Sequence, residues 1–190
     1  MTYGLPTSLE IQGREYEIRA DYRAVLDICI ALADPELTEQ QKGEVILKIF
    51  YPAFESIPLD GLQEALEKCF WFINGGDDQK SRKGPRLMDW EQDFNYIVAP
   101  INRVLGTEVR AVPYDFKANK GGFHWWSFLA AYMEIGGDCT FAQVVSIRDK
   151  LARGKSLDKT DREWMQRNRP LVEFKRKYTK AEDELVKRWT

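Results

Sequence analysis

Apolar residues recur at helical spacing through most of the chain, and polar residues suited to helix caps stand before many of the runs. In the first half, the runs occupy residues 21–34, 38–51 and 59–74, and each ends at Pro or Gly. Asp21 precedes the first run, and Thr38 begins a capping box before the second. Such start and stop signals mark the ends of helices, so the pattern predicts three helices here.

A different pattern precedes these helices. Leu9 and Ile11 alternate with polar residues, Gln12-Gly13 supplies a turn, and Tyr16 and Ile18 alternate on the return. Period-two alternation around such a turn is typical of a β-hairpin. Because a lone hairpin is marginal in water, we expect it to pack against another part of the chain.

The second half repeats the sequence of caps and apolar runs. Asp89 caps a run that Gly106 closes, and Thr140 and Thr160 each begin a capping box. The run that starts at His124 has almost no polar side chains, so its helix should be buried on several sides. The expected helices cover residues 89–105, 124–135, 140–153, 160–168 and 170–189.

Two stretches lack a helical pattern. Residues 75–87 hold no hydrophobic residue before Leu87, which predicts a long solvated loop, and their glycines lack the spacing of a phosphate-binding loop. Residues 107–118 form a connector with strand character at Val109 and Val112. The whole pattern predicts a mainly α protein, a compact multi-helix domain with a small N-terminal β-hairpin.

The charge is distributed unevenly along the chain. The net charge is −2, yet residues 148–190 hold 14 basic and 8 acidic side chains. This asymmetry predicts two parts: a helical body with the N-terminal hairpin over residues 1–154, and a basic C-terminal helical arm over residues 155–190. A basic arm can bind an acidic partner, dock on its own body or simply present a solvated face.

Aromatic and basic residues are interleaved along the arm, and they are the candidate contacts for a partner. They are Trp164, Arg169, Phe174, Lys175, Arg176 and Tyr178. The same pattern would allow stacking and phosphate contact with nucleic acid, but a sequence pI of 5.6 argues against a dedicated nucleic-acid binder. A packed helix stripe accounts for the spacing equally well.

Few residues suit catalysis or metal binding. His124 is the only histidine, no G-x-S-x-G string is present, and the three cysteines have no paired spacing for zinc. Asp89 and Asp93 lie one helical turn apart, which suits a cap and a first-turn acid better than an acid/base pair. Arg148 follows an apolar stretch and is expected to pair with a carboxylate or with backbone carbonyls. We therefore expect no catalytic residues, metal or cofactor.

No apolar stretch approaches the roughly 18–20 residues that a membrane-spanning helix requires. The start of the chain has neither the basic nor the apolar segment of a secretory signal. The odd, scattered cysteines are typical of reduced thiols in a cytosolic protein. The sequence thus predicts a protein of the cytoplasm that does not enter a membrane.

Four stretches, together with the hairpin, resemble the bacteriophage gene-product-15 family. They are residues 20–26, 88–97, 123–128 and 140–148, and the His-Trp-Trp-x-Phe string in the third is the most specific. The family motif and core then comprise Asp89, Asp93, His124, Trp125, Trp126, Phe128, Phe141 and Arg148. The chain departs from the family pattern in its connector and in the loop over residues 75–87.

The resemblance implies a non-enzymatic tail assembly chaperone without a cofactor, acting in the host cytoplasm. Its implied partners are the phage tape measure protein, which such chaperones keep soluble, and the tail-tube protein; a homo-oligomer is a further candidate assembly. The alternatives are a structural virion component, such as a tail-completion or connector subunit, and a nucleic-acid-binding regulator.

Overall fold

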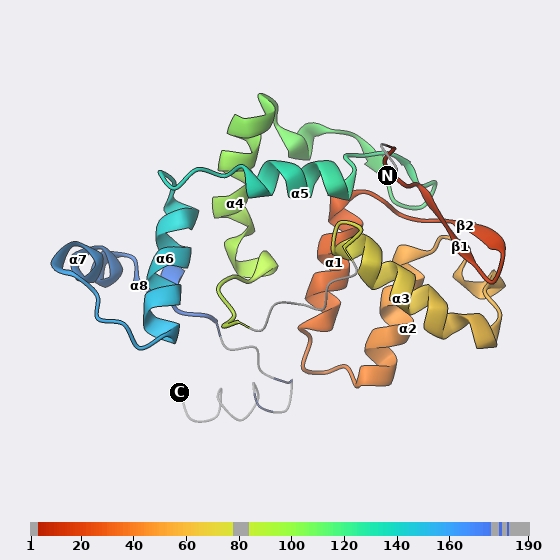
Figure 1. Ribbon diagram of the computed structural model, residues 1–190, viewed down its shortest axis with the longest axis horizontal. Coiled ribbons are helices and arrows are strands. Elements are labelled where there is room, and N and C mark those ends of the chain that lie inside the picture. The colour runs from red at the N-terminus through yellow and green to blue at the C-terminus, as the bar shows by residue number, and fades with distance from the viewer. Residues whose placement is uncertain (1–3, 78–83, 176–178, 180–181, 183–190) are drawn as a thin grey trace. The chain divides into compact units, whose positions relative to one another are not determined.

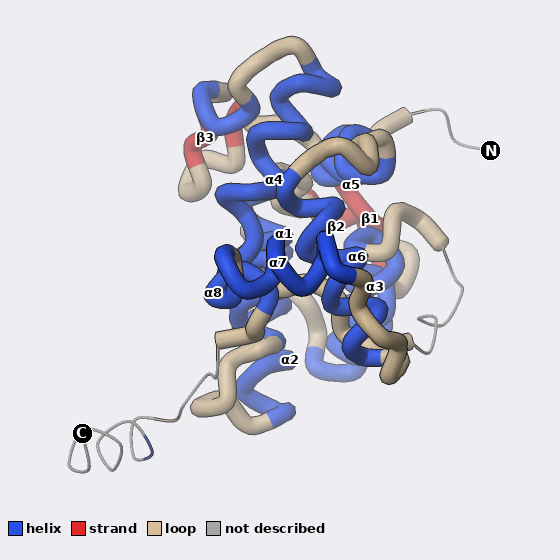
Figure 2. The backbone as a smooth tube through the Cα atoms, turned by 90° about the vertical axis from the view of Figure 1, so that its left-hand side faces the viewer, coloured by secondary structure: helices blue, strands red, loops and turns tan. Residues whose placement is uncertain are grey.

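The protein is mainly helical, with short strands (Figures 1 and 2). The structure is a computed structural model that describes residues 4–77, 84–175, 179 and 182. The α-helices of this part are α1 (Tyr22–Leu32), α2 (Glu39–Phe50), α3 (Leu62–Ile73), α4 (Trp90–Leu105), α5 (Trp125–Met133), α6 (Thr140–Ala152), α7 (Lys159–Arg167) and α8 (Arg169–Val172). The 3-10 turns are η1 (Phe54–Ser56), η2 (Leu59–Gly61) and η3 (Val109–Ala111), and the strands are β1 (Ser8–Ile11), β2 (Arg14–Glu17), β3 (Tyr114–Asp115) and β4 (Lys120–Gly121).

The contacts within the chain divide it into two compact units. The first comprises the described residues of 1–78, 110–129 and 177–190, and the second those of 79–109 and 130–176. Helix α5 runs from one unit into the other. In the second unit α8 packs on α6 and α7. The predicted division into a body up to residue 154 and an arm after it stays a prediction.

The predicted N-terminal hairpin is confirmed. Strands β1 and β2 pair antiparallel, with Leu9 opposite Tyr16 and Ile11 opposite Arg14. The turn between them places Gln12 at φ 49° and Gly13 at φ 76°, the left-handed conformations of a type I′ turn. Leu9, Ile11 and Tyr16 are buried, so one face of the hairpin belongs to the core of the first unit.

The first three helices are also confirmed. Asp21 caps α1 by accepting a hydrogen bond from the Arg23 amide, and Thr38 and Gln41 form the predicted capping box of α2. Helix α3 begins at Leu62, a few residues later than predicted, because η2 takes up the preceding residues. Each of the three buries an apolar face, and α2 packs against both α1 and α3.

Two predicted caps in the second unit are wrong. The cap of α6 is Cys139, whose sulfur accepts from the Ala142 amide, and Thr140 is already the first helical residue. The cap of α7 is Asp158, which accepts from the Asp161 amide at 2.8 Å, in place of Thr160. In both cases the capping side chain is the one that reaches the free amides of the first turn. It stands one residue before Thr140 in α6 and two residues before Thr160 in α7.

The burial of the later helices differs from the prediction as well. As predicted, helix α4 begins after its cap Asp89 and ends at Gly106, whose φ is 68°. Val104, however, which the pattern placed on the buried face, is 41% exposed. Helix α5 is shorter than predicted and is buried through Trp125, Phe128 and Ala131, whereas Met133 is 76% exposed. An apolar composition therefore overstated how many sides of α5 are covered.

The connector carries no strand at Val109 or Val112. Instead, the Val109 amide donates to the Asn102 side chain at 2.9 Å, and this contact accompanies the 3-10 turn η3. The strands of this region lie further on, where β3 and β4 pair through Tyr114 and Gly121. The expected solvated loop over residues 75–87 lies partly outside the described residues.

No helix of the described part is long and apolar enough to cross a membrane. The fold class is the predicted one: a mainly α protein with a small N-terminal antiparallel hairpin.

Two glycines should respond oppositely to alanine. Gly76 has φ 83°, and an added Cβ would lie 2.9 Å from the Trp126 ring, so we expect Gly76→Ala to cost about 1–3 kcal/mol of unfolding free energy. Gly43 lies inside α2 with open space around it, so Gly43→Ala should stabilise by about 0.5–1 kcal/mol. Urea denaturation of the two variants measures both effects, and equal changes would contradict this packing.

Candidate functional site

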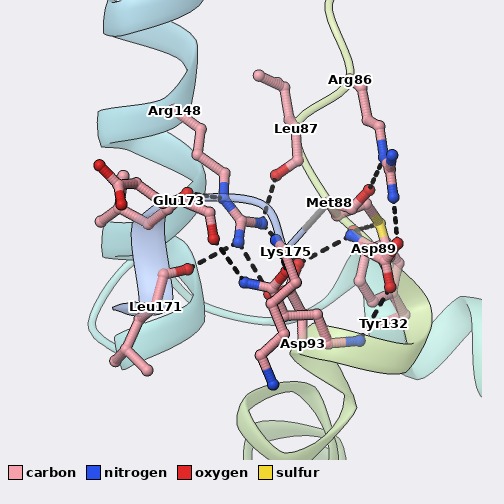
Figure 3. A network of polar contacts seen from close by, with 12 residues as sticks. Arg86, Leu87, Met88, Asp89, Asp93, Tyr132, Arg148, Leu171, Glu173 and Lys175 are labelled. Atoms are coloured by element: carbon pink, nitrogen blue, oxygen red, sulfur yellow. Dashed lines mark hydrogen bonds and ion pairs between the residues drawn. The ribbon is translucent and has the colours of Figure 1, made fainter. Parts of the chain in front are cut away.

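The densest polar network of the second unit centres on Arg148 of α6 (Figure 3). Its guanidinium forms a two-pronged ion pair with Asp93 of α4, with nitrogen–oxygen distances of 2.6 and 3.0 Å. The two side chains are only 3% and 2% exposed, respectively. Buried charges of this kind are tolerated when they are paired and their remaining donors find acceptors.

Every N–H of Arg148 has an acceptor. Besides Asp93, Nε donates to the carbonyl of Val172 at 2.8 Å, and the terminal nitrogens donate to the carbonyls of Leu87 at 3.0 Å and Leu171 at 2.7 Å. A guanidinium has five N–H groups, and five hydrogen bonds use them all. Arg148 thus joins α6 to two other parts of the chain: the start of α4 with the residues just before it, and the end of α8.

The two carboxylates of α4 cap the helix reciprocally. The Asp89 side chain accepts from the Gln92 amide at 2.9 Å, and the Asp93 side chain accepts from the Asp89 amide at 2.9 Å. Asp89 also pairs with Arg86. The sequence prediction of a cap and a first-turn acid is therefore confirmed, but the ion pair with Arg148 could not be read from the pattern.

Residues 173–175, which we call the strap, follow α8 and lie beside Arg148 and Gln92 (Figure 3). The Gln92 side-chain amide donates to the Glu173 carbonyl at 2.9 Å and accepts from the Lys175 amide at 2.9 Å. The ring of Phe174 lies 4.1 Å from the Arg148 guanidinium and 4.8 Å from that of Arg86. The strap is thus held through its main chain and through one aromatic ring.

The predicted partner contacts of the arm have different surroundings. Phe174 is half-buried between guanidiniums of its own chain, whereas Lys175 is exposed. Arg169 is exposed and pairs with Glu173, and Trp164 is half-buried in α7. Arg176 and Tyr178 lie outside the described residues. The structure therefore does not gather the described members into one exposed aromatic and basic stripe.

The family string at the start of α5 belongs to the first unit. The indole N–H of Trp125 donates to the Ile73 carbonyl and that of Trp126 to the Phe72 carbonyl, each at 2.8 Å. These carbonyls belong to the last turn of α3, where the regular helical hydrogen bonds end, and that of Phe72 also accepts from the Gly75 amide at 3.0 Å. The indole N–H groups of the two adjacent tryptophans thus cap the C-terminal end of α3.

Phe128 and Phe141 take the other two aromatic positions of the motif. Phe128 stacks in parallel on Tyr22 of α1, with ring centroids 4.6 Å apart. Phe141 is buried in the second unit and packs on Tyr132 at a centroid distance of 5.9 Å. The motif residues are therefore divided between the cores of the two units.

His124 caps α5 and anchors the N-terminal segment. Its Nδ1 accepts from the Trp126 amide at 3.0 Å, so the proton of the neutral ring is on Nε2, which donates to the Pro6 carbonyl at 2.9 Å. Burial lowers the pKa of the imidazole, although the contact with Pro6 acts in the opposite direction. This geometry requires the neutral form and gives His124 a structural position.

The thiols of the core are not nucleophiles at neutral pH. Burial raises the pKa of Cys29 to about 11 and that of Cys69 further. A reactive cysteine needs a lowered pKa, because the thiolate is the attacking species. Within the part of the chain that the structure describes, no group of three or more His, Cys, Asp or Glu side chains could hold a metal ion.

A second buried arginine escaped the sequence analysis. Arg19, which follows the hairpin, donates to the carbonyls of Lys48, Ile49 and Phe116 at 2.8–3.1 Å, and its guanidinium lies 4.2 Å from the Phe116 ring centroid. It joins the end of α2 to the connector in the first unit. No signal in its neighbourhood marks it, since the preceding alternation would place position 19 outside.

The described side chains of both networks thus hold segments in place. The chain matches the family model described as Bacteriophage Gp15 protein over residues 1–174, and it belongs to this family. It is therefore a bacteriophage protein, in general terms a structural or assembly protein. No curated protein and no solved structure matches it.

Arg148 should be essential to the stability of the second unit. In Arg148→Met the Asp93 carboxylate stays buried without a counter-charge, and we expect a loss of about 3–5 kcal/mol in unfolding free energy. Arg148→Lys keeps the charge but not the five-bond geometry, so it should lose less. Arg153→Ala, which breaks an exposed pair on the same helix, should change the stability by less than about 1 kcal/mol. Urea denaturation of the three variants measures these differences, and a loss for Arg148→Met as small as the control's would refute the role of the pair.

His124 should make the protein sensitive to mild acid. Its folded-state pKa lies below the ordinary 6.5, so between these values the unfolded chain binds the proton and the folded chain does not. The stability is therefore full above about pH 6.5 and declines as the pH falls toward the lowered pKa. His124→Asn keeps a capping acceptor without a titrating ring. Melting temperatures between pH 7.5 and 5 should fall more steeply for the wild type than for this variant; parallel curves would exclude the mechanism.

Proposed function

We propose that this protein is a non-enzymatic tail assembly chaperone that binds the phage tape measure protein in the host cytoplasm and assists assembly of the tail tube. The observation that carries the proposal is membership of the Gp15 family over residues 1–174. Tail assembly requires a factor that keeps a long helical client from aggregating until tube subunits polymerise around it. A stable helical scaffold with charged outer faces suits that task.

The use of polar groups in the described part supports a binding role. The buried charges and the tryptophan N–H groups hold the protein's own segments, and burial raises the pKa of the Cys29 and Cys69 thiols. Such a scaffold leaves its function to outer surfaces, where weak contacts repeated along a client can add up.

Helix α7 is the best described surface for this contact. Its exposed residues carry both signs of charge, including Lys159, Arg162, Glu163 and Arg167. Its inner side is fixed, since Asp161 is buried and pairs with Lys150 and with Gln143 of α6. The outer charges can therefore be changed without removing the contacts that hold the helix.

The proposal predicts co-purification with the tape measure protein. Wild-type chain co-expressed with that protein should hold it in the soluble fraction, and Arg162→Glu combined with Arg167→Glu should reduce the recovery at least threefold. Lys117→Glu combined with Lys120→Glu reverses as many charges at exposed positions of the first unit and should leave the recovery unchanged. Equal recovery with all three proteins would exclude α7 as the contact, and no recovery with the wild type would reject the chaperone role.

Mass spectrometry of purified virions separates the chaperone from a structural component of the particle. A chaperone leaves when the tail is complete, so its peptides should be absent from mature particles. Stoichiometric amounts in the virion would instead assign it to the tail-completion or connector subunits. Measuring DNA affinity at low salt tests the regulator alternative, which requires strong and steeply salt-dependent binding.

A further inference from the structure

An aromatic cavity of the first unit lies beside the N-terminal hairpin. It has a volume of about 370 Å³, and it is lined by the indoles of Trp71 and Trp126 and by residues 4–8. The two indoles meet edge to face, with ring centroids 5.5 Å apart, and both are half-buried. Leu5, which belongs to the lining, is 50% exposed. The cavity therefore offers apolar surface to a side chain that enters from solvent.

Contacts within the first unit fix the walls of this cavity. The indole N–H of Trp126 donates to the Phe72 carbonyl at 2.8 Å, and the Trp126 ring stacks on the Phe72 ring. On the other wall, His124 donates to the Pro6 carbonyl at 2.9 Å and holds the N-terminal segment in place. A site that is formed before binding costs less to occupy than one that must be ordered by its ligand.

Carboxylates lie at the rim of the cavity. Ser8 belongs to the lining, and its hydroxyl donates to the Glu15 carboxylate on β2. Glu67 precedes Trp71 by one turn of α3, which places the two side chains on the same face of the helix, and Glu67 is exposed. The hairpin packs on α3 through β1 (Figure 1), so both carboxylates belong to elements that form the cavity.

The exposed face of the hairpin repels itself. Glu10 lies directly opposite Glu15 in the strand register, and like charges in this position destabilise a hairpin. The hairpin and α3 together carry five glutamates against one arginine and one lysine. A cation at this place would reduce the repulsion and would be attracted by more than one carboxylate.

The side chains of lysine and arginine match this combination of groups. Each has an apolar stem that can lie along the cavity wall and a charged end that stays in water. The indole faces attract a cation, and the carboxylates at the rim can pair with it. An uncharged apolar side chain would use the cavity alone, and an acidic one would be repelled by the rim.

We propose that this cavity binds a lysine or arginine side chain on a basic segment of another protein, with Trp71 and Trp126 along the stem and Glu15 and Glu67 at the charged end. The proposal goes beyond the chaperone role, because it concerns the first unit and applies to any partner that presents such a segment. Complementary charge determines the class of the occupant. Because ions screen exposed pairs, the affinity should fall as the salt concentration rises.

Trilysine is the probe, and the full-length, isotope-labelled chain is the target. Titration should shift the indole N–H signals of Trp71 and Trp126 in two-dimensional NMR spectra. Those of Trp90 and Trp164, which belong to the second unit, should stay in place. Trilysine with acetylated side chains keeps the stems but loses their charges, and it should bind about tenfold more weakly.

Two variants test the rim and the aromatic wall. Glu15→Gln combined with Glu67→Gln removes the charges of two exposed side chains and should weaken trilysine binding about fivefold. Trp71→Leu keeps an apolar wall without the indole face and should weaken it by a similar factor. Glu39→Gln combined with Glu44→Gln is the matched control, because it removes as many exposed charges from α2 of the same unit. It should bind trilysine as the wild type does.

The proposal is wrong if the two indoles of the cavity do not shift, or shift no more than those of the second unit. It is also wrong if acetylated trilysine binds as tightly as trilysine, because the site would then not recognise charge. An equal loss of affinity in the control and in the rim variant would reduce the effect to net charge. If the wild type dimerises with rising concentration and the rim variant does not, the occupant is a basic segment of a second copy and not of another protein.

Discussion

The second unit depends on one buried cation whose five N–H groups all find acceptors. Arg148 pairs with Asp93 and bonds three backbone carbonyls, and the nearly complete exclusion of water from both side chains makes each of these bonds necessary. A partly satisfied guanidinium in this position would cost more than an apolar side chain of the same size. The network therefore specifies a single arrangement of the segments around α4, α6 and α8, and any change to one member affects the others.

In the first unit, hydrogen bonds from several separate side chains, and not from one central arginine, join the segments. The indole N–H groups of Trp125 and Trp126 donate to carbonyls in the last turn of α3, His124 caps α5, and Arg19 donates to carbonyls at the end of α2. Each contact joins the end of one helix to another segment, where unsatisfied backbone groups would otherwise be buried. The family string at residues 123–128 is thus a set of connections between helix ends, and this explains why it combines aromatic bulk with N–H donors.

The distribution of polar groups also bears on what the protein does. In the described residues the buried charges bond side chains and backbone groups of the same chain, while the outer face of α7 is rich in charges of both signs. A protein that serves assembly needs an inner structure that does not change and outer contacts that can form and break.

The sequence by itself determined the hairpin, the first three helices and the cap of α4, because turns, caps and periodicity act through residues a few positions apart. The sequence placed the cap of α6 at Thr140 when it is Cys139, because both side chains can accept a hydrogen bond from the first turn. It also overstated how much of α5 is buried. It identified Arg148 as a buried arginine with a carboxylate or carbonyl partner. Only the tertiary structure decided that the carboxylate is Asp93, 55 positions away, and that the end of α8 supplies two of the carbonyls. Pairing over such a distance depends on how the helices pack, and no spacing rule within the chain encodes it.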